Sequence, residues 1–230
     1  MFVPDKYIYL LATIPFCLIW ILLFVKRKDL QREIIFLSIF TGILSVLTSY
    51  FWWTKDWWRP LTITDTVVGI EDFLLGFFTG GIMSVIYDFI FKKCYINTSS
   101  KKATLNGPLL IIFTACLMEW LFIKVGLTSF WACTITLTLT VIFMILIRRD
   151  LFFDSLVSGV SMMLISVLFY FIIIILSSTW INNTYLNGLS GFRIANVPIE
   201  EFIFWFLAGM WIGPFYEYTT GKRVRNMPRK

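Results

Sequence analysis

Runs of about 20 apolar residues recur along this chain and restrict its fold more than any other feature. Only helices and closed barrels satisfy their own backbone hydrogen bonds in lipid, and a helix of about 20 residues crosses the roughly 30 Å hydrocarbon core. Hydrophobic residues make up 58% of the 230 positions, more than in soluble domains. The sequence therefore predicts an all-α polytopic membrane protein with seven transmembrane helices, at residues 7–25, 34–53, 73–91, 109–125, 127–147, 151–177 and 201–218.

The distribution of basic residues predicts how these spans are oriented. The first run follows Asp5 and Lys6 without a basic head or a small-residue cleavage site, so we expect it to be a retained span. With the N-terminus outside, 15 Lys and Arg residues fall in inner segments and five in outer ones, which is a strong positive-inside bias. We expect a multi-pass protein of the cell (inner) membrane with a cytoplasmic C-terminus. The net charge of +6 then reflects topology and anionic lipid, not nucleic-acid binding.

The chain contains no histidine and four widely spaced cysteines, which restricts its chemistry. His-ligated haem, His-box di-iron sites and His-based triads are excluded. The cysteines form no C-x-x-C pair, so we expect no metal site and interpret them as small buried hydrophobic residues. No G-x-G-x-x-G fingerprint occurs, and no cofactor is predicted.

The two halves of the chain resemble each other. Val-Gly-Ile-Glu-Asp-Phe at 68–73 recurs as Val-Pro-Ile-Glu-Glu-Phe at 197–202, and Arg-Lys-Asp-Leu at 27–30 recurs as Arg-Arg-Asp-Leu at 148–151. Spans one to three thus correspond to spans five to seven. Because the repeat unit has an odd number of spans, a second unit that followed directly would have the opposite orientation in the membrane. The linking fourth span gives both units the same orientation. We predict a first three-span repeat at 1–95, an inner loop and linking span at 96–126, and a second repeat with a basic tail at 127–230.

Each repeat carries a carboxylate pair where its third span begins: Glu71 with Asp72, and Glu200 with Glu201. Acids in a first helical turn also stabilise the helix end, so capping is an alternative interpretation. Neighbours on a helix point about 100° apart, so one member of each pair faces the bundle. Asp72 and Glu201 share their stripes with small and polar residues, so we expect these two to point inward.

Glu119, within the fourth span, is a further candidate acid, since ionisable groups inside a span are often functional; a polar packing contact is the alternative. Desolvation of a carboxyl group in an apolar pocket penalises the anion, so such a group can donate a proton near neutral pH. Aromatic faces nearby would stabilise the carbocation that forms when an alkene is protonated. The predicted substrate-binding rings are Phe73, Phe77, Phe202, Trp205 and Phe206.

The motif Pro198-x-Glu200-Glu201-x-x-Phe204, which opens the last span, resembles the lycopene cyclase domain family. These are small membrane carotenoid cyclases that occur as two subunits or as one fused chain, and the internal repeat is similar to the fused form. The resemblance implies isomerisation of an acyclic end of lycopene into a β-ionone ring, with Glu71, Asp72, Glu200 and Glu201 as acid and base. The first copy departs from the motif at Gly69, Asp72 and Leu75, so whether both halves are catalytic stays open.

Two other functions fit parts of this pattern. A membrane terpene cyclase acting on another polyprenyl substrate would have the same apolar pocket, and a small-solute transporter can also have a three-one-three repeat. A transporter should have polar or broken span centres, whereas the centres here are aliphatic and aromatic. Expected partners are a lipophilic polyene, the lipid bilayer and other carotenoid-pathway enzymes.

Overall fold

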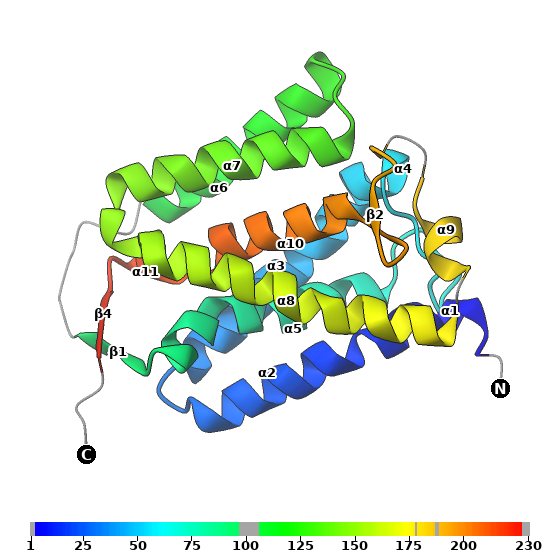
Figure 1. The fold of residues 1–230 in the computed structure, drawn as a ribbon. Helices are drawn as coiled ribbons and strands as arrows, with labels where there is room; N and C mark the ends of the chain where they lie inside the picture. Colours follow the sequence, from blue (N-terminus) through cyan, green and yellow to red (C-terminus); the bar gives the residue numbers. More distant parts are fainter. Residues whose placement is uncertain (1–2, 97–105, 178, 187–188, 227–230) are drawn as a thin grey trace.

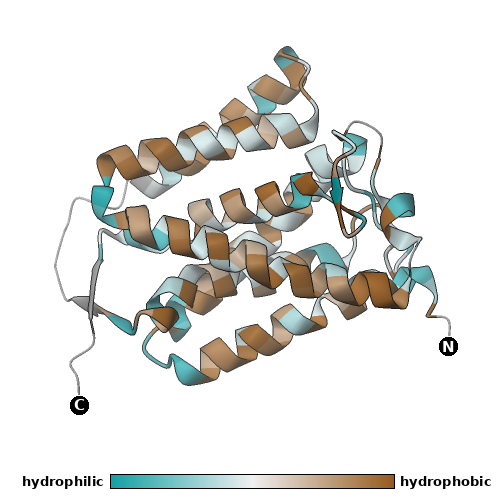
Figure 2. Ribbon diagram, in the orientation of Figure 1, coloured by the Kyte–Doolittle hydropathy of each residue, from teal (hydrophilic) through white to brown (hydrophobic). Residues whose placement is uncertain are grey.

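Long helices run side by side between two polar ends of the molecule (Figures 1 and 2). The computed structural model describes residues 3–96, 106–177, 179–186 and 189–226. We call one end the arginine end, after Arg27 and Arg148, and the other the tryptophan end, after Trp57, Trp58 and Trp180. The helices are α1 (Asp5–Ala12), α2 (Ile14–Lys26), α3 (Gln31–Thr48), the π-helix η1 (Ser49–Trp53), α4 (Thr54–Asp56), α5 (Ile70–Ile90), α6 (Asn106–Glu119), the π-helix η2 (Trp120–Lys124), α7 (Ser129–Ile147), the 3-10 turn η3 (Arg149–Leu151), α8 (Phe152–Leu176), α9 (Trp180–Thr184), α10 (Ile199–Ile212) and α11 (Phe215–Thr220).

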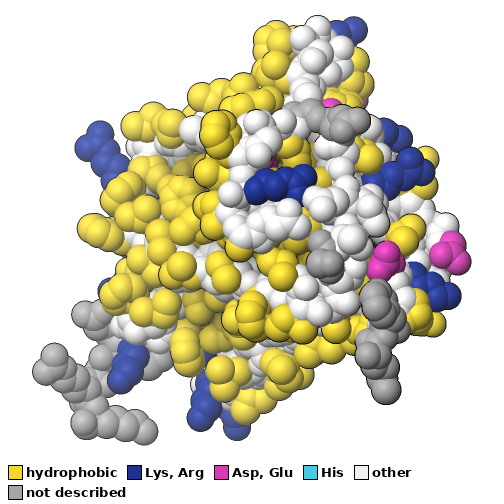
Figure 3. Space-filling view, turned by 45° about the vertical axis from the view of Figure 1, so that its right-hand side comes forward, with side chains coloured by type: hydrophobic (Ala, Val, Ile, Leu, Met, Phe, Trp, Pro, Cys, Tyr) yellow, Lys and Arg dark blue, Asp and Glu magenta, His cyan; other side chains and the backbone are white. Residues whose placement is uncertain are grey.

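Six described helical segments are long and apolar enough to cross a membrane, at Asp5–Lys26, Gln31–Asp56, Ile70–Ile90, Gly107–Lys124, Ser129–Ile147 and Arg149–Leu176. They coincide with the first six predicted spans to within a few residues, which confirms an all-α membrane protein. The predicted break between the fourth and fifth spans is also present: η2 ends at Lys124, and Gly126 has a φ of 77°, which glycine adopts without strain. The space-filling view shows a surface dominated by hydrophobic side chains (Figure 3).

The segment predicted as the seventh span is helical but interrupted. Its main helix, α10, begins at Ile199 and ends at Ile212, and the chain resumes as α11 at Phe215. Pro214 lies between them; proline has no N–H to donate and its ring clashes with the preceding turn. A helix of 14 residues extends about 21 Å, less than the roughly 30 Å of hydrocarbon. The expected single helix at 201–218 is therefore two shorter helices.

Two helix pairs form the tightest contacts in the bundle: α3 packs against α5, and α8 packs against α10. Glycines allow this closeness. A Cβ atom added to Gly80 of α5 would lie 1.7 Å from the Thr41 hydroxyl, and one added to Gly209 of α10 would lie 2.6 Å from the Ser158 carbonyl oxygen. Small residues commonly let membrane helices approach in this way. Helices α6 and α7 lie together on one side of these pairs, and α2 lies on the opposite side (Figure 1).

Two small antiparallel sheets, which the sequence analysis did not predict, complete the fold. At the arginine end, β1 (Lys93–Ile96) pairs with β4 (Arg223–Asn226). At the tryptophan end, β2 (Arg193–Ile194) pairs with β3 (Val197–Pro198), directly before α10. Strand β1 ends where the predicted inner loop begins, at residue 96, and Lys101, Lys102, Arg229 and Lys230 lie outside the described residues.

Candidate active site

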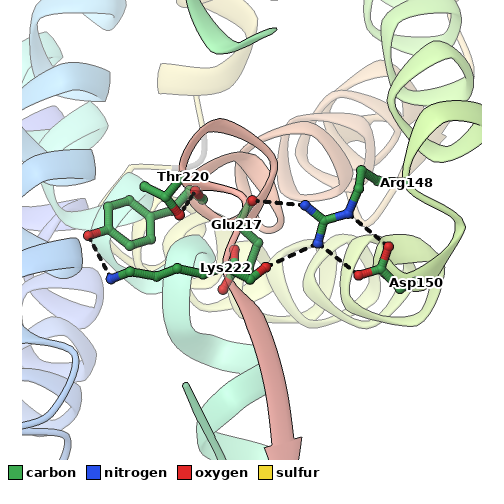
Figure 4. A network of polar contacts seen from close by, with 6 residues as sticks. Arg148, Asp150, Glu217, Thr220 and Lys222 are labelled. Carbon is green, nitrogen blue, oxygen red and sulfur yellow. Dashed lines mark hydrogen bonds and ion pairs between the residues drawn. The ribbon is translucent and has the colours of Figure 1, made fainter. Parts of the chain in front are cut away.

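Arg27 and Arg148 make equivalent contacts at the arginine end. Each donates two hydrogen bonds to an aspartate two residues further on, Asp29 or Asp150. Each also donates to two distant backbone carbonyl oxygens: Arg27 to Asp88 and Lys93 at 2.5 and 2.7 Å, and Arg148 to Glu217 and Lys222 at 3.2 and 3.0 Å (Figure 4). Asp88 and Glu217 lie in the last turns of α5 and α11, and Lys93 and Lys222 follow those helices, so each arginine joins a helix end to the segment after it.

The ion pair of Arg27 and Asp29 predicts a pH dependence of stability. Hydrogen bonds from Arg27 hold the pKa of Asp29 below its ordinary value. A lowered folded-state pKa gives stability that is present above the unfolded-state pKa, about 4, and is lost as the pH falls through the folded-state value. The Asp29 side chain is 45% exposed, so we expect a contribution below about 1 kcal/mol.

Thermal unfolding in detergent measures this contribution. The difference in Tm between the wild type and Asp29→Asn is expected to be largest near neutral pH and to shrink below about pH 4. A difference that does not change with pH would contradict the assignment.

Glu71 and Glu200 are buried and bind the loops that precede their helices. Oε1 of Glu71 accepts a hydrogen bond from the Ile63 backbone N–H at 2.6 Å, and Oε1 of Glu200 accepts one from the Ser190 backbone N–H at 2.5 Å. The two acids occupy matched positions of the sequence repeat. Their geometry suits them to fixing the loops at the tryptophan end.

Asp72 is buried, and its carboxylate accepts hydrogen bonds from two hydroxyl groups and from the backbone at the start of α5. Its Oδ1 accepts hydrogen bonds from the Ser49 hydroxyl at 2.8 Å and the Tyr9 hydroxyl at 3.2 Å. Its Oδ2 accepts one from the Gly69 backbone N–H at 2.9 Å, which caps α5. Three donors therefore hold both oxygens of this carboxylate.

Glu201 has a different environment from its counterpart Asp72. Its Oε2 accepts a hydrogen bond from the Tyr170 hydroxyl. The Tyr170 oxygen in turn accepts from Trp205 Nε1 at 3.1 Å and from the Tyr185 hydroxyl at 3.5 Å. Pro198 occupies the position equivalent to Gly69 and has no N–H, so the backbone bond that ties Asp72 to its helix cannot form here.

A cavity of about 220 Å³ lies next to Glu201, in the part of the bundle towards the tryptophan end. Its wall is mostly apolar, and Glu201 is the one charged side chain among the described residues that line it. Tyr9 and Ser49, whose hydroxyl groups donate hydrogen bonds to Asp72, line the same cavity. Aromatic rings cluster beside the carboxyl group, with centroid separations of 5.2 to 6.0 Å among Trp53, Trp57, Phe204 and Trp205.

The other predicted site residues lie outside this lining, with one exception. Trp205 lines the cavity, whereas Phe73, Phe77, Phe202 and Phe206 do not. The rings of Phe73 and Phe77 are 5.8 Å apart, those of Phe202 and Tyr170 are 6.1 Å apart, and Phe206 packs against Gly159. Glu119 is exposed, and its Oε2 accepts a hydrogen bond from Trp52 Nε1 at 3.0 Å.

Tyr9, Ser49 and Tyr170 were not among the predicted site residues. A signal for two of them was present: Ser49 and Tyr170 are 121 positions apart, the same separation as the two Arg-x-Asp-Leu segments. Both donate a hydrogen bond to the second acid of their half. Tyr9 has no comparable signal, because only the fold brings α1 next to α5.

This fold and site define a helical membrane protein in which a buried carboxyl group faces an apolar, aromatic-walled cavity. Residues 128–219 match the family model for lycopene cyclase, so this part of the chain is similar to that family. The match covers α7 to α11 almost completely and falls within the predicted second repeat. Neither a search of curated proteins nor a search of solved structures found a matching protein.

Proposed function

We propose that this protein is an isomerase that cyclises the acyclic end of lycopene, or of a related polyene, to a β-ionone ring. One observation carries the proposal: Glu201 is the one charged residue on the described wall of an apolar cavity, in a segment that matches lycopene cyclase. Such chemistry requires a proton donor that meets a hydrocarbon out of contact with water, and this site has both components.

In the proposed mechanism, the Glu201 carboxyl group donates its proton to the terminal double bond of the substrate. The product is a tertiary carbocation, and the next double bond along the chain attacks it to close a six-membered ring. The faces of Trp53, Trp57 and Trp205 stabilise the positive charge through cation–π attraction. Tyr170 donates to one carboxyl oxygen and is itself held by two donors, so it orients Glu201 toward the cavity.

Loss of one proton from the cyclic cation restores a neutral product. We propose that Asp72 is the base and acts through the Ser49 or Tyr9 hydroxyl group: the hydroxyl oxygen takes the substrate proton as it gives its own to Asp72. Tyr9 and Ser49 both line the cavity, and their hydroxyl groups donate hydrogen bonds to Asp72. One proton is given and one removed, so the mass and the oxidation state of the substrate do not change. The cycle closes when Asp72 has lost a proton and Glu201 has regained one.

We also propose that the chain contains two parallel three-span repeats, 1–95 and 127–230, joined by a linking span, with α10 and α11 together as the seventh crossing. The equivalent contacts of Arg27 and Arg148 support this arrangement, because the bonded residues are 121 or 129 positions apart, as in the sequence repeat. The positive-inside bias supports an outer N-terminus and a cytoplasmic C-terminus in the cell membrane.

Expression in cells that accumulate lycopene tests the proposed activity. We expect a new pigment with a shorter absorption wavelength and unchanged mass, because each ring closure places the last conjugated double bond inside a ring, where it twists out of the plane of the chain. Chromatography with mass spectrometry measures both properties. Unchanged lycopene in cells with confirmed expression would contradict the proposal, and solute uptake by vesicles containing the protein would favour a transporter.

A further inference from the structure

The cavity reaches the lipid-facing surface between α3 and α6. Leu44, Ser45 and Thr48 line it from α3, at helical spacing, and Thr114, Ala115 and Met118 line it from α6. Ala115 is an exposed residue that also lines the cavity, so the hollow opens to the outside at this position. Exposed hydrophobic residues flank it, including Ile43 and Leu47 on α3 and Ile112 on α6. The opening therefore faces hydrocarbon, and we call it the α3–α6 slot.

Two contacts bound the slot along the membrane normal. Towards the arginine end, Phe40 of α3 stacks on Phe215 at a centroid separation of 5.5 Å and an interplanar angle of 2°. Towards the tryptophan end, the hydrogen bond from Trp52 to Glu119 joins η1 to the end of α6. Between these contacts the facing side chains of α3 and α6 are mostly small or flexible.

The size of the cavity limits what it can enclose. Pockets that bury a drug-sized ligand typically measure about 300–1,000 Å³. The cavity here measures about 220 Å³, so it holds one end of a long polyene but not the whole molecule. A chain whose end lies beside Glu201 must leave the protein, and the α3–α6 slot leads from the cavity directly into lipid.

We infer that the α3–α6 slot is the binding site for the unreacted part of the substrate. A linear hydrocarbon enters sideways from the bilayer, places its end beside Glu201, and keeps its remaining length in the slot and the lipid. This inference rests on the proposed function for the identity of the substrate. It also gives Glu119, first considered as an acid, a positioning role: its bond to Trp52 closes the slot at one end, so that only an extended chain passes.

Substitution of Ala115 by tryptophan tests the slot. A bilayer-soluble hydrocarbon that carries a photoreactive diazirine would be added to vesicles, and its insertion into the segment containing Glu201 would be measured by mass spectrometry. In Ala115→Trp, we expect this labelling and the cyclisation of lycopene each to fall by about tenfold or more, because an indole fills the opening. In the control Ile112→Trp, one turn away on the lipid-facing side of α6, both should stay at the wild-type level.

The two readouts separate the slot from the proposed function. Reduced labelling in Ala115→Trp with no cyclisation even by the wild type would keep the slot as a hydrocarbon site and reject the cyclase. Labelling and cyclisation that are both unchanged in Ala115→Trp would overturn the slot. If Ala115→Trp lowers the Tm, Thr48→Phe narrows the slot from α3, and unchanged labelling in that variant would overturn the inference equally.

Discussion

Replacement of Glu201 by glutamine is expected to reduce ring formation by about 10²–10⁴-fold, the usual contribution of a general acid. Glutamine has nearly the shape of glutamate, and its amide oxygen can still accept the hydrogen bond from Tyr170. It cannot donate a proton to an alkene with the strength of a carboxylic acid. The measurement is the ratio of cyclised pigment to lycopene, in cells or in vesicles with purified protein, at matched expression.

Glu200→Gln is the matched control for this experiment. Glu200 is adjacent and buried, but its Oε1 accepts a hydrogen bond from the Ser190 N–H, which an amide oxygen can also accept. We expect this variant to cyclise at close to the wild-type rate. Full activity in Glu201→Gln would contradict the proposed function, which requires Glu201 as the proton donor. A large loss in Glu200→Gln alone would mean that Glu200, and not Glu201, is the acid.

Hydropathy predicted the spans of this protein well because the bilayer imposes a minimum length on every crossing helix. Six spans lie where the apolar runs lie. The seventh segment shows the limit of this argument, since hydropathy does not distinguish one helix from two that meet at Pro214. The pairing of β1 with β4 was not predictable either, because it joins strands more than 120 residues apart that have no strong alternating pattern.

The acidic residues of the site were predictable, but most of their partners were not. Repetition of the motif identified both acid pairs, and helix geometry distinguishes Glu201, which lines the cavity, from Glu200, which binds a loop. Phe73, Phe77 and Phe206 were chosen for their closeness in sequence to the acids, yet the cavity wall comes largely from other helices. Trp53, Trp57 and Tyr9 join this wall only through tertiary packing.

The acidic motifs at 68–73 and 197–202 differ in sequence, and their hydrogen bonds explain the difference. The first half has Gly69 and Asp72 where the second has Pro198 and Glu201. A shorter side chain and an available N–H let Asp72 cap its own helix, while a longer side chain without that donor leaves Glu201 facing the cavity. A Cβ atom at Gly69 would also lie 2.8 Å from the Thr62 Cβ atom, so a larger residue at this position requires Thr62 to shift. This difference agrees with the separate roles that we propose for Asp72 and Glu201.

Asp72→Asn tests this division of roles, and we expect it to reduce turnover by about 10²-fold, the low end for a general base, with little change in KM. An amide oxygen can still accept from Ser49 and Tyr9, so the wall of the cavity keeps its shape, but the amide cannot receive the proton that the cyclic cation releases. Loss of the bond from the Gly69 N–H is expected to lower the stability by about 1 kcal/mol, which a Tm measurement records separately.

The control for this variant is Glu71→Gln, at the adjacent buried acid whose Oε1 accepts only a loop N–H among its described hydrogen bonds. We expect its turnover to stay near that of the wild type. Wild-type turnover in Asp72→Asn would mean that Glu201, once it has donated its proton, also removes the second proton from the cyclic cation. In that event the first half is a scaffold that completes the cavity, and one carboxyl group performs both proton transfers.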